Sequence, residues 1–183
     1  MLIVGERVNA SRKAIRAALE TLDAAAVASE VRIQAAAGAH YIDVNGGTFP
    51  GREAEMLCWL VDRAQEAPAL PLCLDPSDPA ALAAALPRVR VGRPMVNSIN
   101  LERDRHARVL PLVLEHKAKV IALAQGEDVP ASTTALKVEL ASRLVDSLTG
   151  AGVALDDIYV DPRACTRSAG SPTCPSGFPP ASS

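Results

Sequence analysis

Short apolar runs that end on a polar side chain recur along this chain and constrain its fold more than any other feature. The clearest run spans residues 70–76 (LPLCLDP), where Pro76 cannot continue a strand's hydrogen-bond ladder, so the backbone leaves the sheet at Asp75. A strand buried on both faces reads as a continuous apolar run, and parallel α/β folds bind ligands at the carboxyl ends of their strands. Taken alone, Asp75 could equally cap the next helix. At least five other runs end in the same way, and this repetition favours a ligand site.

Segments with strand and helix patterns alternate, which is typical of a parallel sheet with crossover helices. Apolar residues at 57, 60, 61 and 64, for example, predict one face of an amphipathic helix. Ser11, Asp23 and either Ser132 or Thr133 are expected to cap helices. The expected strands cover residues 2–9, 41–45, 70–75, 94–97, 120–124 and 158–160, and the expected helices cover residues 11–22, 23–38, 79–86, 132–150 and the regions around 57–64 and 109–116.

Two architectures fit this alternation, an open doubly wound sheet and an eight-stranded barrel. A doubly wound nucleotide-binding sheet usually has a Gly-rich loop after its first strand, and residues 5–9 (GERVN) offer no such loop. Polar residues are instead spread one or two per strand end, which is how a barrel builds its site. We therefore expect an α/β fold of the TIM-barrel type. The strand-end residues are Glu6, Asn9, Asp43, Asn45, Asp75, Asn97, Gln125 and Asp161, with Asn100 in the polar exit of the fourth strand.

Charge, hydropathy and cysteine spacing exclude several classes of protein. Nineteen basic and 21 acidic residues give a formal charge of −2, without the clustered basic face of a nucleic-acid-binding protein. No apolar run approaches the ~20 residues that cross a bilayer, and the first residues lack the features of a signal peptide. Neither the four cysteines nor the strand-end carboxylates show a metal-ligand spacing. We expect a cytoplasmic protein without nucleic-acid or membrane partners and without a metal site.

The composition changes abruptly near residue 162. Residues 162–183 contain no Leu, Ile or Val and are rich in Pro, Ser, Gly and Cys, which predicts an irregular or disordered tail. Since an eight-stranded barrel takes ~250 residues, we expect residues 1–161 to form a partial barrel of about six βα units, as in a chain truncated at its C-terminal end.

Five motifs, in order along the chain, resemble one family. They are residues 5–9 (GERVN), 41–46 (YIDVNG), 72–75 (LCLD), 95–100 (MVNSIN, with Glu102) and 159–162 (YVDP). Together they resemble the methyltetrahydrofolate:corrinoid/iron-sulfur protein methyltransferases. These enzymes are pterin-binding TIM barrels related to the folate domain of cobalamin-dependent methionine synthase.

The resemblance implies a function and a set of site residues. It implies transfer of the N5-methyl group of methyltetrahydrofolate to the cobalt of a corrinoid, with Asp75, Asn97 and Asp161 hydrogen-bonding the pterin. The chain lacks the Asp-x-His-x-x-Gly pattern of corrinoid-binding modules, so the cobalamin is expected on a partner protein, and a family-like homodimer is implied. The family's seventh and eighth strands, with a further Asn near the methylated nitrogen, have no counterpart, so no catalytic residue is assigned. Secondary strand-end contacts are expected from Glu6, Asn9, Asp43, Asn45 and Asn100.

Alternatives remain open for both residues and function. Glu6 could pair with Arg7 or Arg12 on the surface, and Asp43 and Asn45 could simply shape the turn at residues 46–47. A second pterin barrel, dihydropteroate synthase, is the alternative enzyme, although its first-loop signature of the Asn-Val-Thr-Pro-Asp-Ser-Phe type is absent between residues 5 and 15. A third reading is a non-catalytic fragment that retains part of the pterin cup.

Overall fold

The computed structural model describes residues 1–47, 49–66, 68–127 and 133–162. Within these residues one sheet of six parallel strands follows the chain order without a reversal. A doubly wound sheet reverses its strand order at a switch point, whereas a barrel adds each strand to the same side of the previous one. The strands are β1 (Val4–Asn9), β2 (Tyr41–Asn45), β3 (Leu72–Leu74), β4 (Met95–Ile99), β5 (Lys119–Leu123) and β6 (Ile158–Asp161).

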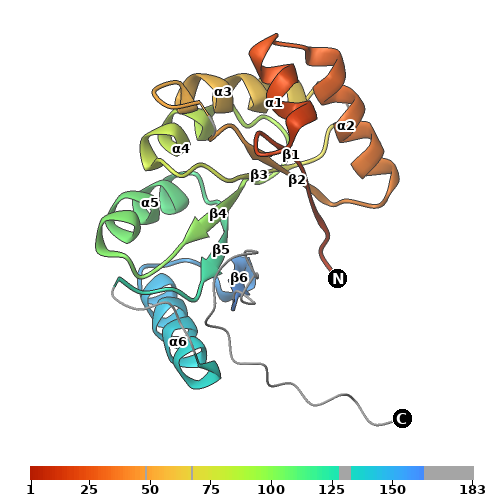
Figure 1. Ribbon diagram of the computed structural model, residues 1–183. Coiled ribbons are helices and arrows are strands. Elements are labelled where there is room, and N and C mark those ends of the chain that lie inside the picture. Colours follow the sequence, from red (N-terminus) through yellow and green to blue (C-terminus); the bar gives the residue numbers. More distant parts are fainter. Residues whose placement is uncertain (48, 67, 128–132, 163–183) are drawn as a thin grey trace.

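The helices lie along the outer side of the curved sheet (Figure 1). Right-handed crossovers that all run in one direction place every helix on the same face, so the opposite face becomes the interior of a barrel-type fold. The predicted TIM-barrel-type α/β architecture is therefore confirmed. The helices are α1 (Lys13–Glu20), α2 (Ala24–Ala36), α3 (Glu53–Ala64), α4 (Pro79–Ala85), α5 (Arg103–Glu115) and α6 (Thr134–Gly150), with single 3₁₀ turns at η1 (Leu86–Arg88) and η2 (Leu155–Asp157).

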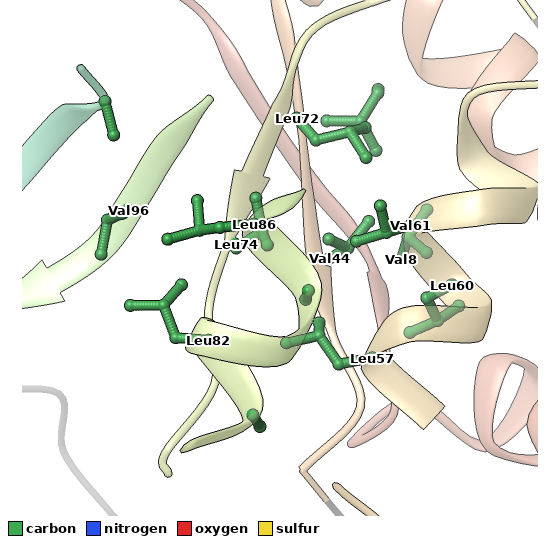
Figure 2. Close-up of a cluster of buried hydrophobic side chains, with 14 of the residues drawn as sticks. Val8, Val44, Leu57, Leu60, Val61, Leu72, Leu74, Leu82, Leu86 and Val96 are labelled. Atoms are coloured by element: carbon green, nitrogen blue, oxygen red, sulfur yellow. The ribbon is translucent and has the colours of Figure 1, made fainter. Parts of the chain in front are cut away.

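The main core lies between the helices and the outer face of the sheet. Leu57, Leu60 and Val61 of α3 are completely buried, and Figure 2 shows them beside Val8 and Val44 of β1 and β2. The predicted i, i+3, i+4, i+7 face of α3 is thus confirmed. Gly46 permits this close packing, because a Cβ there would lie 3.0 Å from the backbone nitrogen of Leu57.

A second, smaller apolar cluster occupies the inner face of the sheet. Tyr41, Cys73 and Met95 form its buried part. Val4, Ile121 and Tyr159 pack against them, so all six strands contribute one side chain. We call these six residues the inner apolar layer.

Most expected boundaries are close to the observed ones, with two corrections. The first helix is not capped by Ser11, because the Asn9 side chain accepts the Ser11 N–H at 2.9 Å and α1 begins only at Lys13. The fourth strand does not end at Asn97 but continues to Ile99, through a register irregularity against β5.

Other helix starts follow from their capping residues. Asp23 and Thr133 cap α2 and α6, as predicted. The cap of α4 is Asp78, whose Oδ1 accepts the Ala80 N–H at 2.9 Å, so Asp75 does not serve as that cap. The tail expected at residues 162–183 lies outside the described residues after Pro162.

Candidate functional site

The candidate site is a polar layer on the inner face, reached two residues after the inner apolar layer along each strand. Side chains two residues apart on a strand point to the same face of the sheet. The residue two positions after each member of the inner apolar layer therefore also faces inward, toward the carboxyl ends of the strands. Five of these six positions are polar, and the sixth is Leu123; they hold Glu6, Asp43, Asp75, Asn97, Leu123 and Asp161. The structure thus brings the three predicted pterin residues, Asp75, Asn97 and Asp161, to one face of the sheet.

Asn97 is held by Asp43 from a strand that is not its neighbour. The Asn97 Nδ2 atom donates to Asp43 Oδ2 at 3.0 Å, although β3 lies between their strands β4 and β2. The residue of β3 beside Asp43 in the register is Cys73, a small side chain that leaves room for this bond. The Asp43 carboxyl group therefore fixes the plane of the Asn97 amide.

Asn45 holds Asp75 in a similar way from the adjacent strand. Its Nδ2 atom donates to Asp75 Oδ2 at 2.8 Å, while its Oδ1 atom accepts the Gly47 N–H at 2.8 Å. Both ends of the Asn45 amide are thus engaged within the protein. The sequence allowed both Asp43 and Asn45 to shape the turn at residues 46–47. Asn45 does shape this turn, whereas Asp43 accepts a hydrogen bond from Asn97.

Asp43 has an unusual protonation equilibrium. The residue is 1% exposed, and burial raises the pKa of its carboxyl group from 3.8 to about 7 against the opposing hydrogen bond from Asn97. The negative charges of Asp75 and Glu6 raise this pKa further, while the Cys73 thiol donates to the carboxylate. Burial and the Asp43 charge in turn raise the pKa of Cys73 well above its usual range. Near neutral pH the layer therefore holds a carboxyl group that gains or loses a proton readily.

Asp161 stands at the far side of the polar layer. It pairs with Leu123 in the parallel register of β5 and β6, and its carbonyl oxygen accepts the Ala124 N–H at 3.0 Å. Its side chain is partly exposed. Gln125, another expected strand-end residue, donates from Nε2 to Glu102 Oε1 at 2.8 Å, which joins the ends of β4 and β5.

The other secondary positions serve mainly local roles. The side-chain oxygens of Asn9 and Asn100 accept backbone N–H groups two residues later, at Ser11 and Glu102, as in Asx turns. The expected alternative for Glu6, an ion pair with Arg7 or Arg12, is wrong: Arg7 pairs with Glu30 of α2 at 2.7 Å, and no ion pair of the described residues joins Glu6 to Arg12.

Two charged helix residues near the site were missed by the sequence analysis. Glu53 of α3 accepts the N–H groups of Ser77 and Asp78 at 2.7 and 3.3 Å. Arg105 of α5 donates to backbone carbonyls in the segments that follow β3 and that end β4. Their only sequence signal is a charge in the first turn of a helix that follows a strand end, which is common on solvated surfaces.

Comparisons with known proteins identify the family. The family model described as "Pterin binding enzyme" matches residues 5–173. The chain therefore belongs to the pterin-binding enzyme family.

Two curated relatives cover most of this chain. A methylcorrinoid:tetrahydrofolate methyltransferase of Eubacterium limosum is 34% identical over 165 residues, which are 88% of this chain and 60% of that protein. A methionine synthase of Mycobacterium tuberculosis is 35% identical over 179 residues, which are 93% of this chain and 15% of that protein. The chain thus spans less than two thirds of either relative.

Solved structures of dihydropteroate synthases share the fold. The enzyme of Xanthomonas albilineans with 4-aminobenzoic acid has a TM-score of 0.66 at 22% identity, over 88% of this chain and 61% of that one. The enzyme of Vibrio fischeri has a TM-score of 0.62 at 19% identity, over 88% and 61%. At these identities the likeness supports the barrel-type architecture alone. In the part of the chain that the structure describes, no helix is long and apolar enough to cross a membrane.

Proposed function

We propose that the polar layer binds the pterin ring of methyltetrahydrofolate through Asp75, Asn97 and Asp161. The supporting observation is their placement at the carboxyl ends of three strands on one inner face, two residues after apolar side chains of the same face. A pterin edge presents ring N–H and amino donors beside a carbonyl acceptor. An ionised carboxylate accepts from two donors at once, and an amide both donates and accepts. The residues therefore fit a pterin in chemical type.

The reaction we propose is methyl transfer between this pterin and a corrinoid carried by a partner protein. Membership of the pterin-binding family and the names of the two curated relatives support this proposal. A corrinoid held by its carrier protein would supply the nucleophile for the methyl group. The chain's own residues bind and orient the pterin, and Asp43 and Asn45 hold Asn97 and Asp75 in place for it.

The proposal extends to the setting of the protein. We place it in the cytoplasm, which the free thiols of Cys58 and Cys73 support, and we propose a homodimer as in the family. Residues 1–161 are proposed to act as one barrel-type unit. Fractionation of the source cells and sedimentation of the purified chain test the first two points.

Titration with methyltetrahydrofolate tests the pterin site. We expect Asp75→Ala to weaken binding by about 5- to 150-fold, because one unmet polar group in a buried pocket costs roughly 1–3 kcal/mol. The matched control is Asp104→Ala, which removes a carboxylate that is 82% exposed and should leave the titration unchanged. Equal curves for the wild-type protein and Asp75→Ala would remove Asp75 from the site.

A second assay tests the reaction class. The E. limosum relative is named for a methylcorrinoid and tetrahydrofolate, the products of the transfer proposed here, so turnover should be measured in both directions with a corrinoid protein. Free cobalamin should separate from the chain in gel filtration, since the partner carries it. Condensation of a pterin with p-aminobenzoate would instead indicate the dihydropteroate synthase alternative. Pterin binding without either reaction would indicate a non-catalytic pterin-binding protein.

A further inference from the structure

Arg105 connects the two segments that carry the central site residues. Its Nε atom donates to the Ser98 carbonyl at 2.8 Å, and its Nη1 and Nη2 atoms donate to the carbonyls of Ser77 and Pro76 at 2.9 and 3.3 Å. Ser98 directly follows Asn97, and Pro76 directly follows Asp75. A single guanidinium group therefore holds both strand ends.

The segment after Asp75 is held from two sides. Glu53 of α3 accepts the N–H groups of Ser77 and Asp78, while Arg105 of α5 takes the carbonyl groups of Pro76 and Ser77. Glu53 makes no hydrogen bond to β4 among the described residues, whereas Arg105 reaches the end of that strand through Ser98. Arg105 thus ties these two segments to each other.

The chemistry of arginine suits this role. A guanidinium is planar and carries five N–H donors in a fixed arrangement, so its three nitrogens can hold three carbonyl oxygens at set angles. A lysine ammonium has the same charge but no such planar geometry. Arg105 is partly buried. Its hydrogen bonds to neutral carbonyls are charge-assisted and therefore stronger than ordinary ones.

We propose that Arg105 is a positioning residue, which fixes the backbones at Asp75 and Asn97 relative to each other. It thereby sets the distance between two of the side chains that are proposed to bind the pterin. This inference rests on the proposed function only for the identity of the ligand. A misplacement of about 1 Å in a binding group is enough to cost a large factor in function. Arg105 therefore acts on pterin affinity without touching the pterin.

The test compares Arg105→Ala and Arg105→Lys with the matched control Arg143→Ala. Arg143 is an exposed arginine of α6 whose ion pair with Glu139 is loose, at 3.8 Å, so its removal changes the net charge equally but should leave the cup intact. Two measurements are made on each variant: hydrogen exchange of the backbone amides in residues 75–78 and 97–101, and titration with methyltetrahydrofolate.

We expect faster exchange in both segments and about tenfold weaker pterin binding in Arg105→Ala, with only partial recovery in Arg105→Lys and no change in Arg143→Ala. A merely electrostatic role would give full recovery in Arg105→Lys and would overturn the proposal. Unchanged exchange in either segment, or unchanged affinity despite faster exchange, would also overturn it. If Arg105→Ala exchanged faster in both segments but the wild-type protein bound no pterin, the positioning role of Arg105 would be supported and the proposed function would be contradicted.

Discussion

Asp43 is a carboxyl group that the fold keeps close to half-ionised at neutral pH. Burial raises its pKa from 3.8 to about 7, so the folded protein retains a proton that the unfolded chain releases above about pH 4. The stability that this neutral carboxyl group provides is therefore fully present below about pH 4. It is lost as the pH rises from about 4 through about 7, because over that range the unfolded chain ionises while the buried group keeps its proton, and the loss is complete once the buried group ionises too.

Asp43→Asn should remove this pH dependence. The asparagine has the same shape and can still accept from Asn97, but it does not ionise. A shift of about three pKa units corresponds to about 4 kcal/mol, so the wild-type free energy of unfolding should fall by that order between pH 4 and 8 relative to the variant. Urea unfolding across this range measures it. A variant curve parallel to the wild-type curve would show that Asp43 ionises normally in the folded protein.

Residue roles at the site were predictable only where they depend on chain neighbours. The Asn45–Gly47 turn bond spans two residues, and the sequence offered it as an alternative. The bond between Asn97 and Asp43 spans 54 residues and crosses an intervening strand. It depends on sheet curvature and on the small size of Cys73, neither of which a local pattern contains.

At the scale of elements, α3 is the helix whose sequence pattern and packing agree most closely. Leu60 is completely buried between α3 and the outer face of the sheet. Leu60→Ala should lower the free energy of unfolding by roughly 2–5 kcal/mol, through lost burial and the cavity left behind. Val138→Ala on α6, at a side chain that is 60% exposed, should change it by less than about 0.5 kcal/mol. Equal midpoints in urea for both variants would contradict the observed packing.

Helices with a full amphipathic repeat were predicted well. The ends of helices and strands were predicted less well where several hydrogen-bonding groups compete for the same backbone. The apolar residues of α3 repeat over two turns of helix, and this spacing fits only an amphipathic helix. Ser11 is a good capping residue, but the Asn9 side chain and carbonyl take the N–H groups of Ser11 and Arg12, and the turn displaces the helix start. Asn97 and Ser98 are polar residues typical of a strand exit, yet the pairing with β5 resumes at Ile99.

For the whole molecule, the described sheet has two unpaired edges, at β1 and at β6, and the β6 edge carries an exposed apolar side chain. Among the described residues β6 pairs only with β5, and its outward-facing Val160 is 46% exposed. Unpaired edge strands with apolar side chains promote pairing between molecules, and a charge on the edge opposes it. We expect the wild-type chain to self-associate as its concentration rises.

Val160→Lys should reduce that self-association without lowering the melting temperature. Sedimentation over a range of concentrations measures the effect, and Val138→Lys, on the exposed side of a helix, is the control for added charge. If both lysine variants associate as the wild-type chain does, the β6 edge is not the contact.

The two-residue step from the inner apolar layer to the polar layer has a consequence for how this protein can change over evolution. Since side chains alternate between the faces of a strand, inserting or deleting one residue between Tyr41 and Asp43, or between Cys73 and Asp75, would turn the carboxylate toward the helices. Length changes should therefore be tolerated between strands and helices and absent between the two layers. Random single-codon deletion, followed by selection for folded protein that binds pterin, should recover deletions in the loops and none at residues 41–43 or 73–75.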